Sequence, residues 1–474
     1  MAGAPYRVVV VGAGASGTLA TARLVEAAAR TGRRITVDLV DPAQETGHGL
    51  AYATPDLRHL LNVPAGRMSA LPHDGDDFVR WLSAREGHRI GADAYVPRAH
   101  YGAYLADGLA RSRAASGPYA RVRRRRERVV AAESNPATGV GIRVHLHGGG
   151  SLDADAVVLA LGNQPPGTAW APAALRASPR FVADPWQPGA LAAVPADRDV
   201  LLVGTGLTMC DVARTLAAPG RTLHAVSRQG RLPQAHTPSP SPPAVHRPGP
   251  PTGPPTGLPT GPHDLARLKR EVLRRVALHR RHDGDWRPAV DGLRPHTARL
   301  WQQLSPADRE RFLTGELREW EVHRHRLPPV THQALEAARE AGTLTVRAAE
   351  VNGARISGDG ELLQVRLSDG RSTAVGAVVN CTGADDRVRD WADPLVRSLL
   401  DGGLAVPGPH GLGFDTAADG GLIPSADRAA APVWTLGRLR RGNLWETTAI
   451  PEIRVQAAEL AASLLGGAPV RLPA

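Results

Sequence analysis

The chain has 474 residues, of which 42% are hydrophobic and only 4% aromatic. This length and composition fit two or three domains with true cores and argue against wholesale disorder. The formal net charge of +11 is carried almost entirely by arginine, because Lys269 is the only lysine. Such a surplus occurs in nucleic-acid-binding proteins, but it also follows from GC-rich coding, and we expect no nucleic-acid partner.

The two cysteines, Cys210 and Cys381, lie far apart in the chain. This spacing excludes a disulfide framework, a CxxC redox pair and a thiolate zinc cluster, so we expect a reducing compartment and no metal. No stretch approaches 18 uninterrupted apolar residues, and the first strand-like run begins at Arg7, which leaves no room for a signal peptide before it. We therefore expect a cytoplasmic protein with no membrane partner.

The first motif follows a short apolar run at residues 7–11, the pattern of a strand buried on both faces. Gly12, Gly14 and Gly17 come next, and residues 18–30 are rich in Ala and Leu, as in a helix. The glycines allow a tight turn, a close approach to a pyrophosphate and close helix packing, while the helix N-terminus attracts the phosphates. A second strand ends in Asp41, about where an acid binds ribose. These features predict a dinucleotide site that also contains Ser16.

A second motif of the same kind follows the apolar run at residues 200–203. It carries Gly204 and Gly206, but Met209 replaces the third glycine before the helical stretch 210–217. The next strand, at 223–226, ends in Ser227 and Arg228 instead of an acid. A hydroxyl beside an arginine favours a 2′-phosphate, so this pair predicts NADPH; alternatively, Arg228 is an exposed arginine in an arginine-rich chain.

The two motifs together predict an α/β protein with two Rossmann-like dinucleotide-binding domains, for FAD first and NADPH second. Strand patterns at 156–162 and 377–383, each ending in glycine, indicate where the chain passes between the domains. We expect a discontinuous FAD domain, 1–166 and 376–474, with the NADPH domain, 167–375, inserted into it. Within that insertion we expect a proline-rich segment, 233–262, as either a lid or a tolerated insertion, and a helical segment, 263–326.

Several stretches resemble a family of bacterial FAD/NAD(P)-binding proteins grouped with flavin-dependent urate hydroxylases and aspartate N-monooxygenases, near the class B flavin monooxygenases. The stretches that carry the resemblance are 12–17, 49–52, 60–65, 67–69, 78–82, 161–163, 204–211, 320–326 and 444–454. Within the second motif, Gly204, Gly206, Thr208 and Asp211 are similar to the G-x-G-x-S-x-x-D/E form of NADPH sites in flavin monooxygenases. The resemblance extends over nearly the whole chain apart from the proline-rich segment.

The resemblance implies that further residues contact the FAD. These residues are Tyr52, Asn62, Met68 and Ser69. Apart from the resemblance, a late strand pattern ends in Gly437, which we expect at the flavin, and a closing helix follows at 452–465, whose N-terminus near Pro451 we expect to face the flavin ring. The resemblance also implies an NADPH-consuming monooxygenase that hydroxylates a small, anionic, nitrogen-containing substrate with O2 through a flavin hydroperoxide. The candidate substrate residues are Arg294, His323, Arg324, His325 and Arg326, because arginine forks suit a carboxylate or an anionic purine.

Two alternatives remain open. One is an NAD(P)H-dependent flavoprotein reductase or dehydrogenase that passes electrons to a quinone or a partner, and the other is a nucleotide-binding redox sensor. The sequence identifies neither the substrate nor the oligomeric state.

Overall fold

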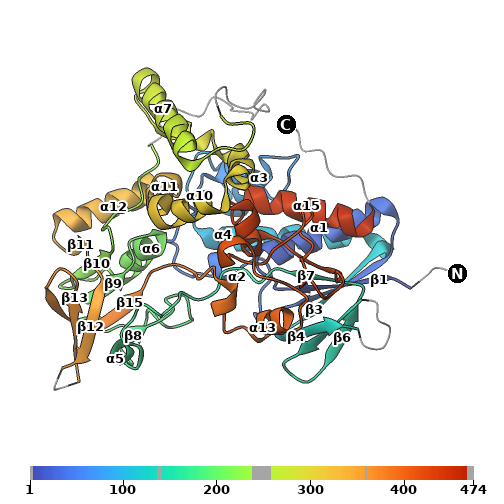
Figure 1. Cartoon of the computed structure of the whole chain (residues 1–474), viewed down its shortest axis with the longest axis horizontal. Helices are drawn as coiled ribbons and strands as arrows, with labels where there is room; N and C mark the ends of the chain where they lie inside the picture. Colours follow the sequence, from blue (N-terminus) through green and yellow to red (C-terminus); the bar gives the residue numbers. More distant parts are fainter. Residues whose placement is uncertain (1–3, 136–140, 238–257, 358–359, 467–474) are drawn as a thin grey trace.

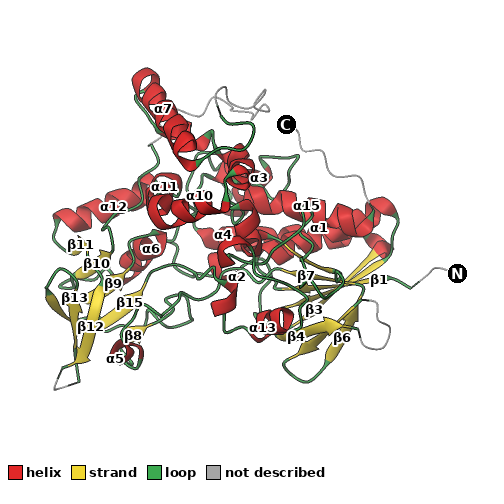
Figure 2. Ribbon diagram, viewed as in Figure 1, coloured by secondary structure: helices red, strands yellow, loops and turns green. Residues whose placement is uncertain are grey.

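The computed structural model describes residues 4–135, 141–237, 258–357 and 360–466. Two separate parallel sheets dominate this part of the chain, and helices and smaller antiparallel sheets cover them (Figures 1 and 2). Most of the proline-rich segment, residues 238–257, lies outside the described residues.

The first sheet has five parallel strands in the order β16–β7–β1–β2–β3. Their bounds are β1 Tyr6–Val11, β2 Ile35–Val40, β3 Ala120–Arg125, β7 Ala156–Leu159 and β16 Val433–Thr435. The valines of β1 are buried, as the apolar run predicted. The arginine-rich β3 lies at the edge, where charge discourages pairing with another chain.

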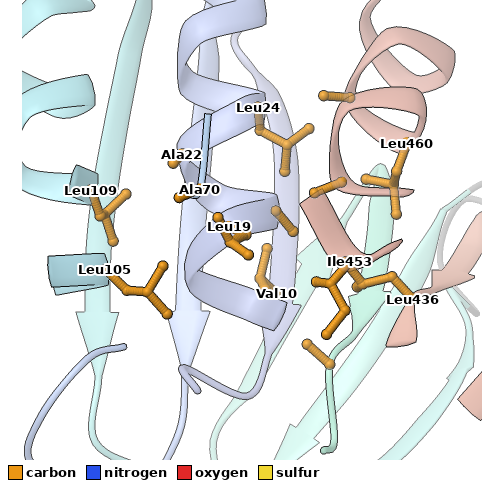
Figure 3. Packing of buried hydrophobic residues seen from close by; sticks show 14 of the residues in the cluster. Val10, Leu19, Ala22, Leu24, Ala70, Leu105, Leu109, Leu436, Ile453 and Leu460 are labelled. Atoms are coloured by element: carbon orange, nitrogen blue, oxygen red, sulfur yellow. The ribbon is translucent and has the colours of Figure 1, made fainter. Parts of the chain in front are cut away.

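Helices α1 (Ala15–Thr31), α4 (Arg98–Ala115) and α15 (Ile450–Leu465) share the apolar core on one face of this sheet. Figure 3 shows Leu19 and Leu24 of α1 packed between the sheet and α15, which contributes Ile453 and Leu460. The other face packs against the antiparallel sheet β4 (Val129–Ser134), β5 (Ile142–Leu146) and β6 (Ser151–Ala154), together with α13 (Pro394–Asp401). Segments from both ends of the chain therefore build one domain.

The second sheet is also parallel, in the order β11–β10–β9–β15–β8. Its strands are β8 Phe181–Val182, β9 Val200–Val203, β10 Leu223–Ser227, β11 Leu344–Ala348 and β15 Ala377–Asn380. Helices α6 (Leu207–Leu216) and α12 (Pro329–Glu340) cover one face, and the antiparallel strands β12 (Val351–Ile356), β13 (Leu363–Leu367) and β14 (Ser372–Val375) cover the other.

The position of β15 corrects the expected boundary between residues 375 and 376. Ala377–Asn380 pairs with β9 of the second sheet, so the chain returns to the first sheet only after Asn380. The two passages of the chain lie side by side, because Pro166 and Ala384 form a bridge and the Asn380 amide donates to the Gly167 carbonyl at 3.2 Å. A buried strand followed by glycine occurs in both sheets, so its sequence alone does not assign it to one.

The segment 263–326 is helical, as predicted. It contains α7 Leu265–Asp283, α8 Arg287–Asp291, η3 Arg294–His296, α9 Thr297–Gln303, α10 Pro306–Arg311, the π-helical turn η4 Phe312–Glu316 and α11 Leu317–Arg324. The remaining helical elements are α2 Gly49–Tyr52, η1 Ala65–Arg67, α3 Asp77–Glu86, η2 Gly117–Tyr119, α5 Ala173–Arg176, η5 Val388–Asp390, η6 Pro409–Gly411, η7 Gly437–Arg440 and α14 Arg441–Leu444. Within the described residues, every helix is too short or too polar to cross a membrane.

Candidate functional site

The first glycine turn connects β1 to α1 and leaves no space for side chains at two of its positions. Gly12 has a φ of +101°, and a Cβ there would lie 2.3 Å from the Ala160 carbonyl oxygen. A Cβ on Gly17 would lie 1.8 Å from the Gly12 carbonyl oxygen. These two glycines are therefore required by the turn itself, whether or not a nucleotide binds.

Gly14 has a different role, because it is the N-cap of α1 and no side chain caps the helix there. A Cβ on Gly14 would lie 3.2 Å from the Gly49 Cα, so a second glycine closes tightly over the turn. The helix N-terminus keeps backbone N–H groups available for an anion such as a pyrophosphate. The stretch around Gly49 was expected only through the family resemblance. The structure places it against the first glycine turn and the open N-terminus of α1, which together we call the first cradle.

Ser16 and Gly437 meet at the same helix end, although they lie far apart in the sequence. A Cβ on Gly437, whose φ is +71°, would lie 3.2 Å from the Ser16 Oγ. The Gly437 N–H donates to the Gln456 side chain at 2.9 Å, which ties this turn to α15. The structure thus gathers Gly12, Gly14, Ser16 and Gly437 around one helix N-terminus.

Asp41 follows β2 and helps to hold the first turn. One carboxylate oxygen accepts a 2.7 Å hydrogen bond from the Ala13 N–H, and the other accepts a 2.7 Å bond from the Ala43 N–H. Each carboxylate oxygen has a second lone pair, so the group can still accept a bond from a ribose hydroxyl.

The other residues expected near FAD occupy two kinds of position. Tyr52, Asn62 and Pro451 are half-buried, and the Tyr52 ring lies 4.9 Å from that of Tyr101. The side chains of Met68 and Ser69 are buried in the protein instead. The Ser69 hydroxyl donates to backbone carbonyls. The side chains of Met68 and Ser69 therefore contact the protein interior.

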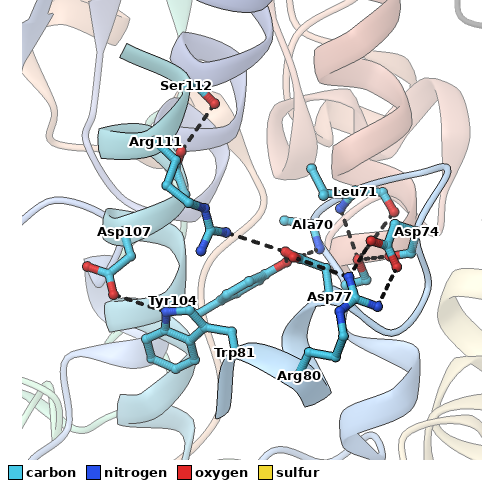
Figure 4. Close-up of polar contacts among 12 residues, drawn as sticks. Ala70, Leu71, Asp74, Asp77, Arg80, Trp81, Tyr104, Asp107, Arg111 and Ser112 are labelled. Carbon is cyan, nitrogen blue, oxygen red and sulfur yellow. Dashed lines mark hydrogen bonds and ion pairs between the residues drawn. The ribbon is translucent and has the colours of Figure 1, made fainter. Parts of the chain in front are cut away.

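A polar network braces the segment that contains Ser69 (Figure 4). The Tyr104 hydroxyl donates to Asp77 at 2.6 Å and accepts from the Ala70 N–H at 3.0 Å. Arg80 pairs with Asp74, whose carbonyl oxygen receives the Ser69 hydroxyl. The network fixes the turn that follows Met68.

The second glycine turn connects β9 to α6. Gly204 has a φ of +108°, and a Cβ there would lie 2.3 Å from the Cys381 carbonyl oxygen. Gly206 is the N-cap of α6 and again lacks a side-chain cap. Thr208 is half-buried on the first turn of α6, and Met209, in the third glycine position, is fully buried in the core.

Asp211 does not face this turn in the way its position in the motif suggests. It forms an ion pair with Arg98 at the start of α4, in the first domain. Its carbonyl oxygen also accepts from the His59 ring at 3.2 Å. Burial lowers the pKa of His59, so the ring is neutral at neutral pH. Asp211 therefore joins the two domains, and its expected role as a nucleotide ligand stays a prediction.

Ser227 and Arg228 lie at the carboxyl end of β10, next to the second turn. The Ser227 hydroxyl shares a 2.7 Å hydrogen bond with the Thr205 hydroxyl, whereas Arg228 is exposed. An exposed guanidinium at this strand end remains available to a 2′-phosphate.

Arg318 is the clearest residue at this turn that the sequence did not single out. Its Nη2 donates to the Thr205 carbonyl at 3.0 Å and to the Arg231 carbonyl at 2.6 Å. Among the described residues outside the turn and its helix backbone, its Nη1 is the atom nearest to the Cβ that Gly206 would carry, at 3.9 Å. The π-helical turn η4 immediately precedes α11, which carries Arg318, and π-turns are frequent at functional sites.

All three arginines among the five candidate substrate residues are paired with carboxylates, and Arg326 pairs with Asp291. Arg294 makes a bidentate pair with Glu452 at 2.7 and 2.8 Å, and Arg324 pairs with Glu446 at 2.9 to 3.1 Å. Glu452 lies on the first turn of α15, so Arg294 reaches the helix end that was expected to face the flavin.

His325 lies near Arg294 and Arg324, whose charges both act on it, whereas His323 and Arg326 line two different pockets. His325 is reachable by solvent yet densely surrounded by protein, and this crowding together with Arg324 holds its pKa well below the usual range. His323 lines a pocket of about 540 Å³ beside the turn 230–234, while Arg326 lines another pocket of about 570 Å³. The five residues therefore do not form a single cluster.

Both cysteines are buried, and burial raises the pKa of each thiol. Such thiols are poor nucleophiles at neutral pH. Within the described ranges, no group of three or more His, Cys, Asp or Glu is placed to hold a metal ion.

Comparisons with known proteins agree with this arrangement. Residues 9–164 match the model of a family described as FAD-NAD(P)-binding, and this range contains the first glycine turn and Asp41. No curated protein matches the chain.

Solved structures share its fold over almost the whole length. A reduced ornithine hydroxylase from Pseudomonas aeruginosa has a TM-score of 0.62 at 16% identity, over 98% of this chain and 99% of that one. An L-lysine 6-monooxygenase from Pseudomonas syringae gives 0.63 at 15%, over 97% and 99%. An ornithine N-hydroxylase from Kutzneria sp. 744, solved with reduced FAD, NADP+ and L-ornithine, gives 0.61 at 14%, over 97% and 99%.

These matches confirm the predicted α/β fold class, and the predicted dinucleotide cofactors agree with the family that residues 9–164 match. The finer resemblance to urate hydroxylases and aspartate N-monooxygenases stays a prediction. The chain thus shares its fold with an ornithine hydroxylase and an L-lysine 6-monooxygenase, and residues 9–164 match a FAD-NAD(P)-binding family.

Proposed function

We propose that this protein is an FAD-dependent, NADPH-consuming monooxygenase that hydroxylates a small, anionic, nitrogen-containing substrate. The observation that carries the proposal is the pair of glycine turns at the ends of β1 and β9, each opening a helix whose N-terminus has no side-chain cap. The fold shared with ornithine and lysine hydroxylases supports the choice of reaction class.

The first cradle fits FAD. Gly14 leaves the N-terminus of α1 open, Ser16 and Gly437 lie at the same end, and Asp41 offers lone pairs for the ribose. A pyrophosphate there would accept backbone N–H bonds, with the helix dipole favouring its charge. Tyr52, Asn62 and Pro451 are the half-buried residues that remain to contact the ring system.

The second cradle fits NADPH. Gly206 leaves the N-terminus of α6 open, Arg318 lies beside it, and Arg228 is exposed at the adjacent strand end. Bound together, the two cofactors would supply hydride transfer and oxygen activation, which no side chain of the protein can perform. The protein then binds and orients them and excludes water.

The cysteines weigh against a dithiol reductase. Cys210 and Cys381 are the only two in the sequence, and both are buried with raised thiol pKa values. A reductase that uses only its flavin needs no thiols, so the cysteines do not bear on it, and the experiment below distinguishes it from a monooxygenase.

The test begins with purification of the full chain and measurement of bound FAD by absorbance and mass spectrometry. NADPH oxidation under air is then followed with candidate nitrogen-containing acids, and products are analysed after reaction with 18O-labelled oxygen. Substrate-dependent incorporation of one labelled atom supports the proposal. Rapid quinone reduction without labelled product contradicts it in favour of a reductase, and the absence of FAD and of any turnover contradicts it in favour of a sensor.

A further inference from the structure

A pocket of about 570 Å³ lies between loops of the two domains, and this volume suits a small molecule. The first domain contributes Pro64, Arg67 and residues 93–95, and the second contributes His236 and Arg326. The His236 ring donates from Nε2 to the Asn62 carbonyl at 3.0 Å. A residue of the pocket wall is therefore in direct contact with Asn62, which is expected near the flavin.

Arg326 is the buried cation of this pocket, with only 2% of its surface exposed. Its Nη2 donates to Asp291 at 2.5 Å. Its Nε and Nη1 are buried and have no hydrogen-bond partner among the described residues. Desolvated N–H groups of a guanidinium are costly to leave unpaired, so this side chain is suited to an anionic acceptor that enters the pocket.

Other groups around Arg326 supply a second cation and neutral polar atoms. Arg67 is exposed, and its guanidinium has no partner among the residues that the structure describes. Burial, reinforced by Arg326, lowers the pKa of His236 to about 4, so its ring is neutral and Nδ1 is free to accept. Burial raises the pKa of Tyr95 to about 12, so its hydroxyl stays protonated and can donate.

We propose that this pocket binds the carboxylate group of the substrate, with Arg326 as the buried anchor and Arg67 as the second cation. The inference rests on the proposed monooxygenase function, because it names the substrate class of that reaction as small carboxylic acids.

The charges around the pocket favour a carboxylate over a phosphate. Three arginines line it, at 67, 287 and 326, together with three aspartates, at 93, 285 and 291. Arg287 is held by Asp285, and Arg326 is partly neutralised by Asp291. The three arginines and three aspartates balance in charge, so a singly charged carboxylate would be held by the unpaired N–H groups of Arg326, whereas a dianionic phosphate would meet the nearby aspartates at a higher electrostatic cost.

The test measures binding directly, by isothermal titration of the full-length, FAD-loaded protein without NADPH. Succinate, L-aspartate and benzoate serve as carboxylate probes, and inorganic phosphate serves as the second anion. We expect at least one carboxylate to bind, and Arg67→Ala to weaken it by about 10- to 150-fold, the range for one charge-assisted hydrogen bond. Arg267→Ala, on an exposed position of α7, is the matched control and should leave binding unchanged.

Arg326→Lys tests the anchor while keeping its charge beside Asp291, and bound FAD and the melting temperature check that the variant is folded. A similar loss of carboxylate affinity, with phosphate bound weakly throughout, supports the proposal. Wild-type affinity in both variants overturns it, as does tighter binding of phosphate or no binding of any probe by the wild type. If carboxylates bind through these arginines but FAD and NADPH oxidation are absent, the proposed function fails and the pocket assignment stands.

Discussion

Arg98 of α4 donates a charge-assisted hydrogen bond to Asp211 of α6, and this ion pair joins the two domains next to the second glycine turn. Both side chains are largely buried, with 19% and 12% of their surfaces exposed. The pair is therefore shielded from solvent much better than an ordinary surface ion pair.

The first prediction follows from this pair. Asp211→Ala leaves Arg98 buried without its partner, which should cost about 3 kcal/mol of unfolding free energy. The ratio of KM for NADPH to KM for NADH should stay unchanged, because the carboxylate is engaged by Arg98 and not by the nucleotide. Chemical denaturation and steady-state kinetics measure the two quantities. A changed cofactor ratio with unchanged stability would instead support Asp211 as a nucleotide ligand.

The second prediction separates the glycines of the first turn. Gly14→Ala introduces a Cβ at 3.2 Å from Gly49, a contact that small shifts can relieve, so the variant should fold. It should bind FAD at least about tenfold more weakly, because the methyl group occupies the approach to the helix N-terminus. Gly17→Ala is the contrasting variant, since its Cβ would overlap the Gly12 carbonyl, and it should fail to fold. Full FAD occupancy in folded Gly14→Ala would contradict the cradle assignment.

The third prediction concerns the nicotinamide cofactor. Arg228→Ala should raise KM for NADPH by about 10- to 150-fold and leave KM for NADH nearly unchanged, because only NADPH carries the 2′-phosphate. Arg228 is exposed, so the substitution should not alter the melting temperature. Equal effects on both cofactors would remove the reason for assigning the 2′-phosphate to this residue.

The fourth prediction concerns Arg318, which lies beside Gly206. NADPH and NADH share the pyrophosphate, so Arg318→Ala should weaken both by a similar factor, about tenfold or more. Arg318→Lys, which keeps the charge, should recover part of the affinity for NADP+ and NAD+ in a titration. The affinity for adenosine 2′-monophosphate, which lacks the pyrophosphate, should be unaffected. An effect on that probe as well would indicate that Arg318 only holds the turn through the Thr205 and Arg231 carbonyls.

The fifth prediction concerns pH. The pKa of His236 is about 4 in the folded protein, against about 6.5 when unfolded, so between these values the unfolded chain binds more protons. The contribution of His236 is complete above about pH 6.5 and is lost as the pH falls to about 4; its upper limit is about 3 kcal/mol. His236→Gln, which can still donate to Asn62, should reduce the loss of stability between pH 7 and pH 4.5 in denaturant titrations. An identical pH profile for wild type and variant would contradict this.

The sequence predicted the features that depend on local geometry. Gly12 and Gly17 belong to a turn whose steric demands act within a few residues, so their spacing after an apolar strand was sufficient to identify them. The helices of the segment 263–326 were likewise indicated by local composition. Both glycine turns were located to the residue.

Features that depend on contacts between distant segments were not predicted. Asp211 has the position of a nucleotide ligand in its motif, and only the three-dimensional structure shows that Arg98 of α4 pairs with it. The string 320–326 looked like one cluster, but successive helical residues point in different directions, so His323 and Arg326 line different pockets. Arg318 carried no signal, because one arginine in a helix of an arginine-rich chain is not distinctive.

The pairing of β16 with β7 and the packing of α15 on α1 set the order in which a nascent chain can fold. The second sheet is complete in sequence once Asn380 has been synthesised, whereas the first still lacks β16 and α15. At ordinary rates of translation, on the order of ten seconds pass between the synthesis of Asn380 and the completion of α15. During that interval the exposed apolar side of β7 is a target for chaperones, and the domain that begins the chain is the last to be finished.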